Sequence, residues 1–231
     1  MTDAERPDPA AALRTRAERD PEAPALFFRG GRGHFRWWSW RRLAAEVAGS
    51  AGTARSSREG ETGDSLRELL RVLVEGELDG LGPRASSLAS RLGSGPERDI
   101  WISSRPLELA AERVLLATAL LGGWAVVREP VSPLPPETFA WARPTLLSGA
   151  VGEVRDLLEG FGALAPRWGA ARWRRRRLAR LRAVILDEEE GGEPISARLA
   201  GLGSSARVVP LPPPSMERNG VVERRAEGEP P

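Results

Sequence analysis

The strongest candidate for chemistry in this sequence is the arginine-rich run RWRRRR at residues 172–177. A guanidinium group is always charged and binds phosphate or carboxylate groups through parallel hydrogen bonds. The run therefore predicts an anion-binding helix surface, made of Arg172, Arg174, Arg175, Arg176 and Arg177 and flanked by Trp168, Arg167, Arg180 and Arg182. Its ligand would be the phosphates of CoA, nucleic acid or an anionic membrane. The alternative is a solvated helix face that pairs with the acidic residues 187–190.

Other reactive residue types are scarce. His34 is the only histidine, and without a neighbouring carboxylate we interpret it as a surface residue of a strand and not as a general base. The acidic run at 187–190 could bind a cation, but such runs are typically solvated loops. With no cysteine and one histidine, the sequence predicts neither a disulfide nor a metal site. The glycine-rich segment 30–33 lacks a following helix and predicts a hairpin turn.

The 34 basic residues are all arginine, and the sequence contains no lysine. The net charge is only +2, so charge alone does not predict nucleic-acid binding. The N-terminus has no apolar signal segment, and the longest apolar run, 114–127, is shorter than the roughly 20 residues that span a bilayer. We therefore expect a cytoplasmic protein without a transmembrane segment.

Periodic apolar residues predict alternating helices and strands. Strands are expected at 25–28, 34–38, 99–103, 124–127, 145–147, 181–186 and 206–211. Helices are expected at 10–19, after an N-cap at Ser39, and at 65–75, 84–92, 107–121, 151–161, 168–178 and 195–202. The first two strands predict a hairpin in which Trp37 and Trp38 face opposite sides. The alternation through 99–211 predicts an α/β fold, with a mostly parallel sheet flanked by helices.

One domain is expected at residues 9–211. Small polar residues at 49–64 predict a flexible insertion, and residues 128–137 a proline-rich connector. Residues 1–8 and the tail 212–231 have little apolar surface to bury and are predicted to be disordered.

Three blocks of sequence resemble acyl-CoA synthetases and other AMP-dependent, adenylate-forming ligases. The first is 13–48, with RAERDPEAPAL followed by WSWRRLAAEVA. The second is ELAAERVLLATALLGGWAVVREP at 108–130. The third combines ARPTLLSGAVGEVRDLL at 142–158 with LARLRAVILDEEEGGEPIS at 178–196 and LGSSARVVPLP at 202–212. The resemblance implies part of the large N-terminal α/β domain of such a ligase.

The resemblance also implies a nucleotide-binding turn. In the family, a GGEP turn lies near the adenine pocket, and this sequence carries Gly191, Gly192, Glu193 and Pro194 at the corresponding place. ATP, AMP or CoA would then be the ligand, by resemblance alone.

The sequence departs from the family where the chemistry is done. The Ser/Thr/Gly-rich phosphate loop, the catalytic lysine, the aromatic-Gly-x-Thr-Glu motif after Pro210 and the C-terminal lysine domain are not found. The TGD at 62–64 lies too early to be the family motif, and Asp64 is expected to cap a helix. We therefore expect a degenerate, truncated relative that serves as an accessory protein, with an acyl-CoA, an acyl carrier protein or a catalytic subunit as partner. The alternatives are a subunit of a split ligase, and a basic module for nucleic acid or membrane.

Overall fold

The computed structural model describes residues 8–29, 34–50, 64–93, 99–129, 131–187 and 192–211. The tail predicted at 212–231 lies outside this part of the chain, as do residues 1–7 and the predicted turn at 30–33. Of the predicted insertion at 49–64, only residues 49, 50 and 64 are described, and these are helical.

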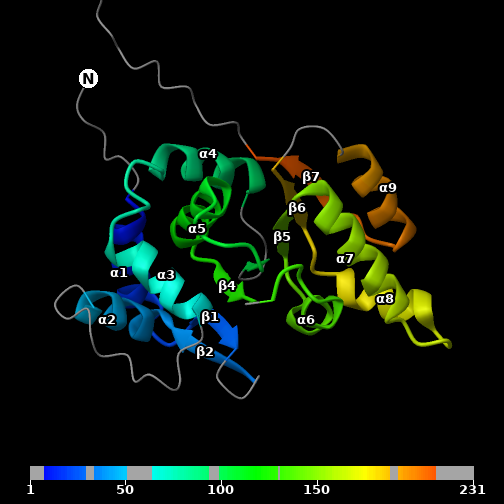
Figure 1. Ribbon diagram of the computed structural model, residues 1–231, viewed down its shortest axis with the longest axis horizontal. Coiled ribbons are helices and arrows are strands. Elements are labelled where there is room, and N and C mark those ends of the chain that lie inside the picture. The colour runs from blue at the N-terminus through cyan, green and yellow to red at the C-terminus, as the bar shows by residue number, and fades with distance from the viewer. Residues whose placement is uncertain are drawn as a thin grey trace, which may run out of the picture.

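A seven-stranded sheet with the order β2-β1-β4-β3-β5-β6-β7 forms the centre of the protein (Figure 1). β1 and β2 form the predicted antiparallel hairpin, and all other neighbouring strands pair in parallel. The strands are β1 Pro24–Arg29, β2 Phe35–Ser39, β3 Ile100–Ser103, β4 Ala125–Arg128, β5 Leu146–Gly149, β6 Ala183–Leu186 and β7 Arg207–Pro210. The predicted mostly parallel α/β fold is confirmed.

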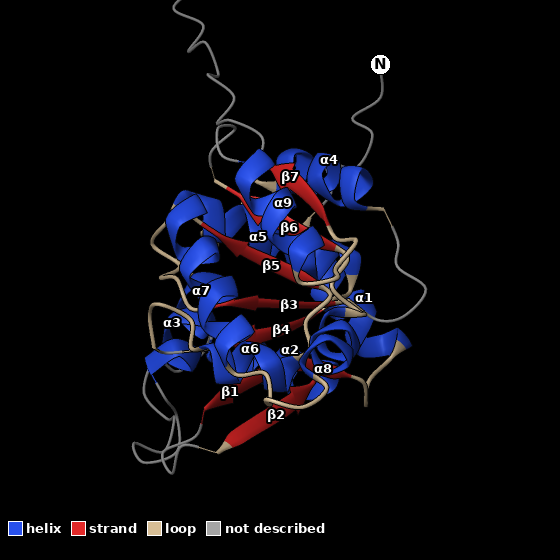
Figure 2. Cartoon of the chain, turned by 90° about the vertical axis from the view of Figure 1, so that its right-hand side faces the viewer, coloured by secondary structure: helices blue, strands red, loops and turns tan. Residues whose placement is uncertain are grey.

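Helices cover both faces of the sheet, which gives three layers (Figure 2). One core contains residues of α1 Pro9–Arg19, α2 Trp40–Ser50, α3 Asp64–Val74, α4 Gly82–Leu92 and α5 Ala110–Gly122. The other contains residues of α6 Pro136–Ala142, α7 Val151–Ala163, α8 Ala170–Leu178 and α9 Gly192–Gly201. Successive residues of a strand point to opposite faces of the sheet, so their apolar side chains pack alternately in the two cores. Trp101, for example, packs in the first core and Ile102 in the second.

The hairpin obeys the same alternation. Trp38 is buried at 7% exposure, whereas its neighbour Trp37 is 51% exposed, which confirms that the two side chains face opposite sides. The Ser39 hydroxyl accepts a hydrogen bond from the Arg42 amide at 3.3 Å and so caps α2 as predicted. Gly123 ends α5 in the left-handed conformation, at φ 67°.

Several predicted boundaries differ from the structure, among them the start of α5 at Ala110 and of α9 at Gly192, and two differences have a clear physical reason. The segment interpreted as a proline-rich connector, 128–137, leads directly into α6, which was not expected. Pro136 occupies the first turn of that helix, where the missing N–H has no intrahelical partner to lose. The basic helix begins at Ala170 and not at residue 168, because Gly169 precedes it in the left-handed conformation at φ 76°. Among the described residues, no helix is long and apolar enough to cross a membrane.

Candidate functional site

Polar side chains gather at the carboxyl ends of the parallel strands. In open α/β sheets, ligands bind at this edge, where the connections after the strands form a crevice. Here β3 ends at Ser103, β4 at Arg128 and β5 near Ser148, and Asp187 follows β6. All four residues are polar, so this edge concentrates side chains that could do chemistry.

Glu112 is the centre of this group. It lies on α5, is fully buried, and accepts a hydrogen bond from the Ser103 hydroxyl at 2.5 Å. The Ser148 hydroxyl lies 3.5 Å from its other oxygen, and Trp101 Nε1 donates to that hydroxyl at 2.9 Å. Burial raises the pKa of Glu112 to about 7, although Ser103 and two arginines favour the ionised form. A carboxyl with this pKa changes its charge near neutral pH.

Arg128 is the first of these two arginines. Its side chain is only 2% exposed, and its Nη1 lies 3.6 Å from a Glu112 oxygen. Its Nη2 donates to the Arg105 carbonyl at 2.6 Å and to Glu68 Oε2 at 3.2 Å. Burial raises the pKa of Glu68, while the Leu107 amide and Arg128 oppose that rise. The positive charge of Arg128 is therefore neutralised by carboxylates of the protein itself.

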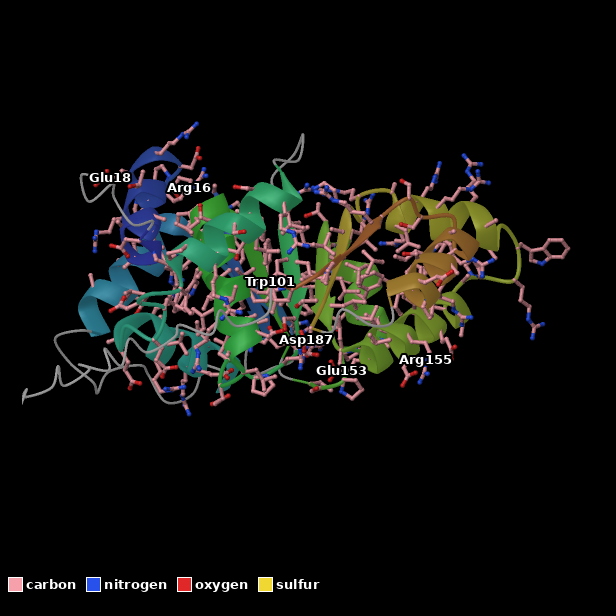
Figure 3. All side chains as sticks on the ribbon, turned by 90° about the horizontal axis from the view of Figure 1, so that it is seen from above. Arg16, Glu18, Trp101, Glu153, Arg155 and Asp187 are labelled. Carbon is pink, nitrogen blue, oxygen red and sulfur yellow. The ribbon has the colours of Figure 1, made fainter. Side chains whose placement is uncertain are left out.

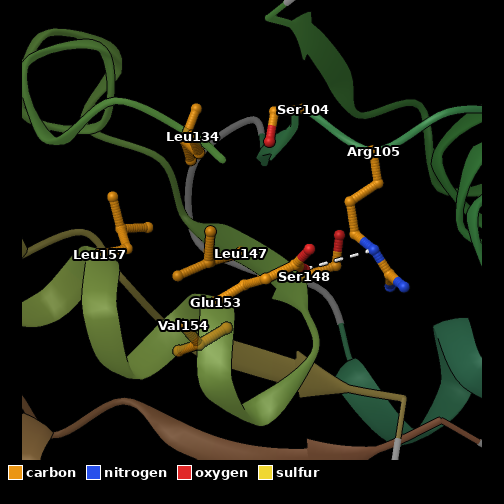
Figure 4. A pocket seen from close by; sticks show the side chains of 8 residues that line it. All are labelled: Ser104, Arg105, Leu134, Leu147, Ser148, Glu153, Val154 and Leu157. Atoms are coloured by element: carbon orange, nitrogen blue, oxygen red, sulfur yellow. Dashed lines mark ion pairs between the residues drawn. The ribbon is translucent and has the colours of Figure 1, made fainter. Parts of the chain in front are cut away.

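Arg105 is the second. It is hydrogen-bonded to Asp187, its Nε lies 3.4 Å from Glu153, and its Nη1 lies 3.9 Å from Glu112. Burial disfavours its charge, but the hydrogen bond to Asp187 and the negative charges of Asp187, Glu112 and Glu153 together outweigh this, so the pKa of Arg105 is raised. Figure 3 labels Asp187 and Glu153 near the middle of the long axis of the molecule. Figure 4 shows the Arg105–Glu153 ion pair at the rim of a pocket.

That pocket is small and partly apolar. Its volume is about 290 Å³ including the solvent at its mouth, and it is lined by Ser104, Arg105, Leu134, Leu147, Ser148, Glu153, Val154 and Leu157 (Figure 4). One of its walls is the start of α7. There, the Glu153 carboxylate accepts a hydrogen bond from the Ala150 amide at 3.1 Å. A helix N-terminus is a natural phosphate site, but here a carboxylate of the protein already lies on it.

A second ion pair occupies the same edge on the opposite face of the sheet. Arg29 Nε lies 2.9 Å from both oxygens of Glu129, whose side chain is fully buried. Thr138 on α6 bridges the pair: its hydroxyl accepts from Arg29 Nη2 at 2.9 Å and donates to Glu129 at 2.8 Å. This group joins β1, β4 and α6 and has no remaining charge for a ligand.

The predicted nucleotide-binding turn is only partly described. Gly192, Glu193 and Pro194 form the first turn of α9, and Gly191 lies outside the described residues. None of the three lines the pocket beside Arg105. Their role in binding ATP or AMP stays a prediction.

The predicted anion-binding helix exists, and its arginines differ in exposure. Arg172, Arg175 and Arg176 are exposed, whereas Arg174 and Arg177 are half-buried. Arg177 Nη1 donates to the Ala140 carbonyl at 3.1 Å. Binding of an anion by these five side chains stays a prediction.

The proposed partners of that helix are corrected by the structure. The alternative in which residues 187–190 pair with the basic helix does not hold for Asp187, which pairs with Arg105, and residues 188–190 are not described. Arg182 is not part of the helix surface either. It holds the buried Asp99 with contacts of 2.5 and 3.1 Å, because the two residues lie together at the amino ends of β6 and β3.

The remaining candidates offer no catalytic group. His34 is exposed, as predicted, but it lies just before β2 and not on it. No cluster of histidine, aspartate and glutamate that could hold a metal is found in the described segments. A larger hollow of about 770 Å³, including open solvent, lies at the amino edge beside Asp99, Thr145 and Arg182. We give it less weight, because it lies at the opposite edge from the usual ligand site of parallel sheets.

Solved structures of adenylate-forming enzymes are similar to this chain. CmiS6 matches 87% of this chain and 70% of its own length, with a TM-score of 0.61 and 13% identity. The N-terminal subdomain of NpsA from Klebsiella oxytoca was solved with 3-hydroxyanthranilyl-AMSN. Its match covers 87% of this chain and 72% of the NpsA chain, with a TM-score of 0.59 and 13% identity. For o-succinylbenzoate CoA synthetase (MenE) from Bacillus subtilis, solved with its acyl-adenylate intermediate OSB-AMP, the match covers 83% of this chain and 56% of the MenE chain, with a TM-score of 0.54 and 14% identity.

The chain has the fold of the N-terminal part of an adenylate-forming ligase. At 13–14% identity the likeness establishes the ligase-like fold and nothing about activity. The chain spans 56–72% of the length of these three structures. Neither a protein-family model nor a curated protein matches the sequence. The ligase-like fold thus confirms the resemblance, and the ion-paired carboxyl edge is what the sequence did not reveal.

Proposed function

We propose that this chain is a relative of adenylate-forming ligases that does not itself form adenylates and that acts as an accessory or binding protein. The proposal rests on one observation: the carboxyl edge of the sheet is occupied by ion pairs between the protein's own side chains. Two arginines there, Arg105 and Arg128, lie among four carboxylates, Glu68, Glu112, Glu153 and Asp187.

This charge distribution disfavours a nucleotide. A triphosphate would have to displace carboxylates from Arg105 and approach Glu153, which accepts the Ala150 amide at the start of α7. Like charges at close range are costly in a partly buried site. Displacing a partner from a buried arginine also leaves a buried carboxylate without its cation.

The sequence supports the same proposal. A phosphate loop would be expected between the second and third blocks of family resemblance, but residues 129–145, which join β4 to β5, contain α6 and no glycine-rich segment. No lysine is present in the sequence to neutralise a transferring phosphate. Arginine is a poor substitute, because its planar fork cannot reproduce the compact charge of an ammonium group.

The proposal is tested by ATP–pyrophosphate exchange with a panel of carboxylic acids, with an active ligase as the positive control. We expect exchange no faster than in the absence of protein. Acid-dependent exchange that is lost in Arg105→Ala would overturn the proposal, because it would place adenylation at the edge that the ion pairs occupy.

A second candidate is a subunit of a split ligase, and an exposed aromatic patch favours it. Trp141 is 50% exposed and stacks on Phe35 at 4.1 Å, and Trp37 is 51% exposed on the neighbouring strand surface. Large exposed aromatics often mark a protein interface. In this case, exchange would appear only after a chain carrying the phosphate loop and the C-terminal lysine is added. It would weaken in Trp141→Asp.

An acyl-CoA and an acyl carrier protein are the ligands we propose for the accessory role, and we place the protein in the cytoplasm. The two ligands are proposed from the family resemblance of the sequence. Binding of acyl-CoA without binding of ATP would support the accessory role directly.

A further inference from the structure

The connection between α7 and α8 presents a tryptophan to solvent. Trp168 is 92% exposed, the highest value among the large exposed apolar residues of the described chain. Its neighbours Pro166, Arg167 and Gly169 are exposed as well. Figure 1 shows this connection projecting beyond α8 at one end of the long axis. An indole in this position contributes nothing to the core and is available to a partner outside the chain.

The helix that follows this connection, α8, exposes several arginines. Trp173 stacks on Phe161 at 5.1 Å and Leu178 is buried, so these residues fix the inner side of α8. Arg172, Arg175 and Arg176 are spaced by three and four residues and are exposed on the outer side. The helix is therefore held in place by apolar contacts while its charges remain available.

Two further arginines extend this surface. Arg143 is exposed, and its Nη2 donates to the Arg176 carbonyl at 3.4 Å, which places its guanidinium against the outer end of α8. Arg167 directly precedes Trp168. Within the described part of the chain, no carboxylate forms an ion pair with these five, Arg143, Arg167, Arg172, Arg175 and Arg176. No carboxylate among the residues that the structure describes neutralises them, in contrast to Arg105 and Arg128.

We propose that Trp168 and these five arginines form a docking site for an anionic lipid bilayer. Tryptophan prefers the boundary between headgroups and acyl chains, and arginine binds lipid phosphates. The connection that carries Trp168 projects at one end of the molecule, which suits contact with a flat membrane (Figure 1). Single-stranded nucleic acid would require a groove with several aromatic platforms. The second tryptophan of this segment, Trp173, is packed inward against Phe161.

The size of the effect follows from the number of charges. An arginine near an anionic leaflet strengthens binding by roughly fivefold. Replacing Arg172, Arg175 and Arg176 by glutamine is therefore expected to weaken binding to anionic vesicles by roughly 100-fold. Trp168→Ala should weaken it by about tenfold, since an indole that enters the interface leaves water.

The test is co-sedimentation of the full chain with vesicles of 70% phosphatidylcholine and 30% phosphatidylglycerol, at low salt and at near-physiological salt. The matched control replaces Arg14, Arg19 and Arg41, three exposed arginines on α1 and α2, by glutamine, which changes the net charge equally. Trp37→Ala is the control for an exposed tryptophan. Far-UV circular dichroism and a thermal melt confirm that each variant is folded.

The proposal predicts binding to anionic vesicles that falls with salt, little binding to pure phosphatidylcholine, and losses confined to the α8 and Trp168 variants. Three results would overturn it: no sedimentation with anionic vesicles at low salt, an equal loss in the α1–α2 control, or full binding by Trp168→Ala. Tighter binding to a single-stranded oligonucleotide than to the vesicles, lost in the same α8 variant, would overturn it in favour of nucleic acid. A failed exchange assay leaves this test unaffected, because the two sites share no residue.

Discussion

Replacing Glu112 by glutamine should change how the stability of the protein depends on pH. The Glu112 carboxyl is fully buried, and burial raises its pKa to about 7 from the ordinary value of 4.5. In the unfolded chain it ionises near 4.5, so the unfolded state loses its proton first as the pH rises. The folded protein then becomes less stable between about pH 4.5 and pH 7 through this group, and the loss is complete above pH 7.

The magnitude follows from the shift. One pKa unit corresponds to about 1.4 kcal/mol, so the rise from 4.5 to about 7 costs about 3 kcal/mol of unfolding free energy at pH 8. Glutamine resembles the protonated carboxyl and has no ionisation to suppress. Between pH 4 and pH 8, the unfolding free energy of Glu112→Gln should therefore gain about 3 kcal/mol relative to that of the unchanged protein.

The assay is urea denaturation, followed by circular dichroism, at several pH values between 4 and 8. Glu159→Gln is the control for the loss of one carboxylate, because Glu159 is 53% exposed in its ion pair with Arg198. The unfolding free energy of Glu159→Gln should depend on pH nearly as that of the unchanged protein does. Parallel profiles for Glu112→Gln as well would refute the reasoning, since Glu112 would then titrate in the folded state as it does in water.

Three further substitutions test the packing. Arg182→Ala removes the cation from buried Asp99 and should lower the unfolding free energy by about 3 kcal/mol in urea denaturation; a loss below about 0.5 kcal/mol would mean that Asp99 is solvated. Arg29→Met should lower the unfolding free energy by a similar amount, because it leaves the buried Glu129 carboxylate without its cation. Arg29→Lys keeps a positive charge and should lower the unfolding free energy less in the same measurement. Gly123→Ala should lower the melting temperature through a loss of about 1 kcal/mol or more, because φ is 67° and the new Cβ would fall 2.3 Å from the Arg16 guanidinium; an unchanged melting temperature would contradict that backbone conformation.

The sheet could be predicted from the sequence because its signals are local. Short apolar runs such as 124–127 and 181–186 alternate with amphipathic segments, and each run can be interpreted without knowing where the others lie. Gly123 marks a helix end because, without a Cβ, it tolerates a positive φ, and Ser39 marks a helix start because its hydroxyl accepts a hydrogen bond from the first turn. The helix α6 was missed for an equally local reason, since a proline at its start resembles a connector.

The charged network at the carboxyl edge could not be predicted in this way. Glu68, Arg105, Glu112 and Arg128 come from four separate elements or loops, and Asp187 comes from a fifth. In the sequence, Glu112 is one polar residue in the first turn of a helix, with nothing to show that it would be fully buried. Only the strand order brings β3, β4, β5 and β6 together, so the partners of each charge follow from the topology.

The arginine run shows the reverse case. Its composition predicted a charged helix, and the helix is present. The alternative that residues 187–190 pair with it does not hold for Asp187, which pairs with Arg105. Residues 178 and 187 lie close along the chain, but β6 lies between them and carries Asp187 to the other end of the strand from α8. Closeness in the sequence therefore does not bring Asp187 to the basic helix.

Calorimetric titration with ATP and magnesium tests most directly whether the carboxyl edge is closed to nucleotide. The sample must unfold cooperatively, so that a missing signal reports on the folded protein. We predict no heat of binding for ATP–magnesium, in a sample that gives a measurable heat with an acyl-CoA. Saturable binding of ATP that disappears in Arg105→Ala would contradict the account, because the arginines at this edge would then be available to phosphate.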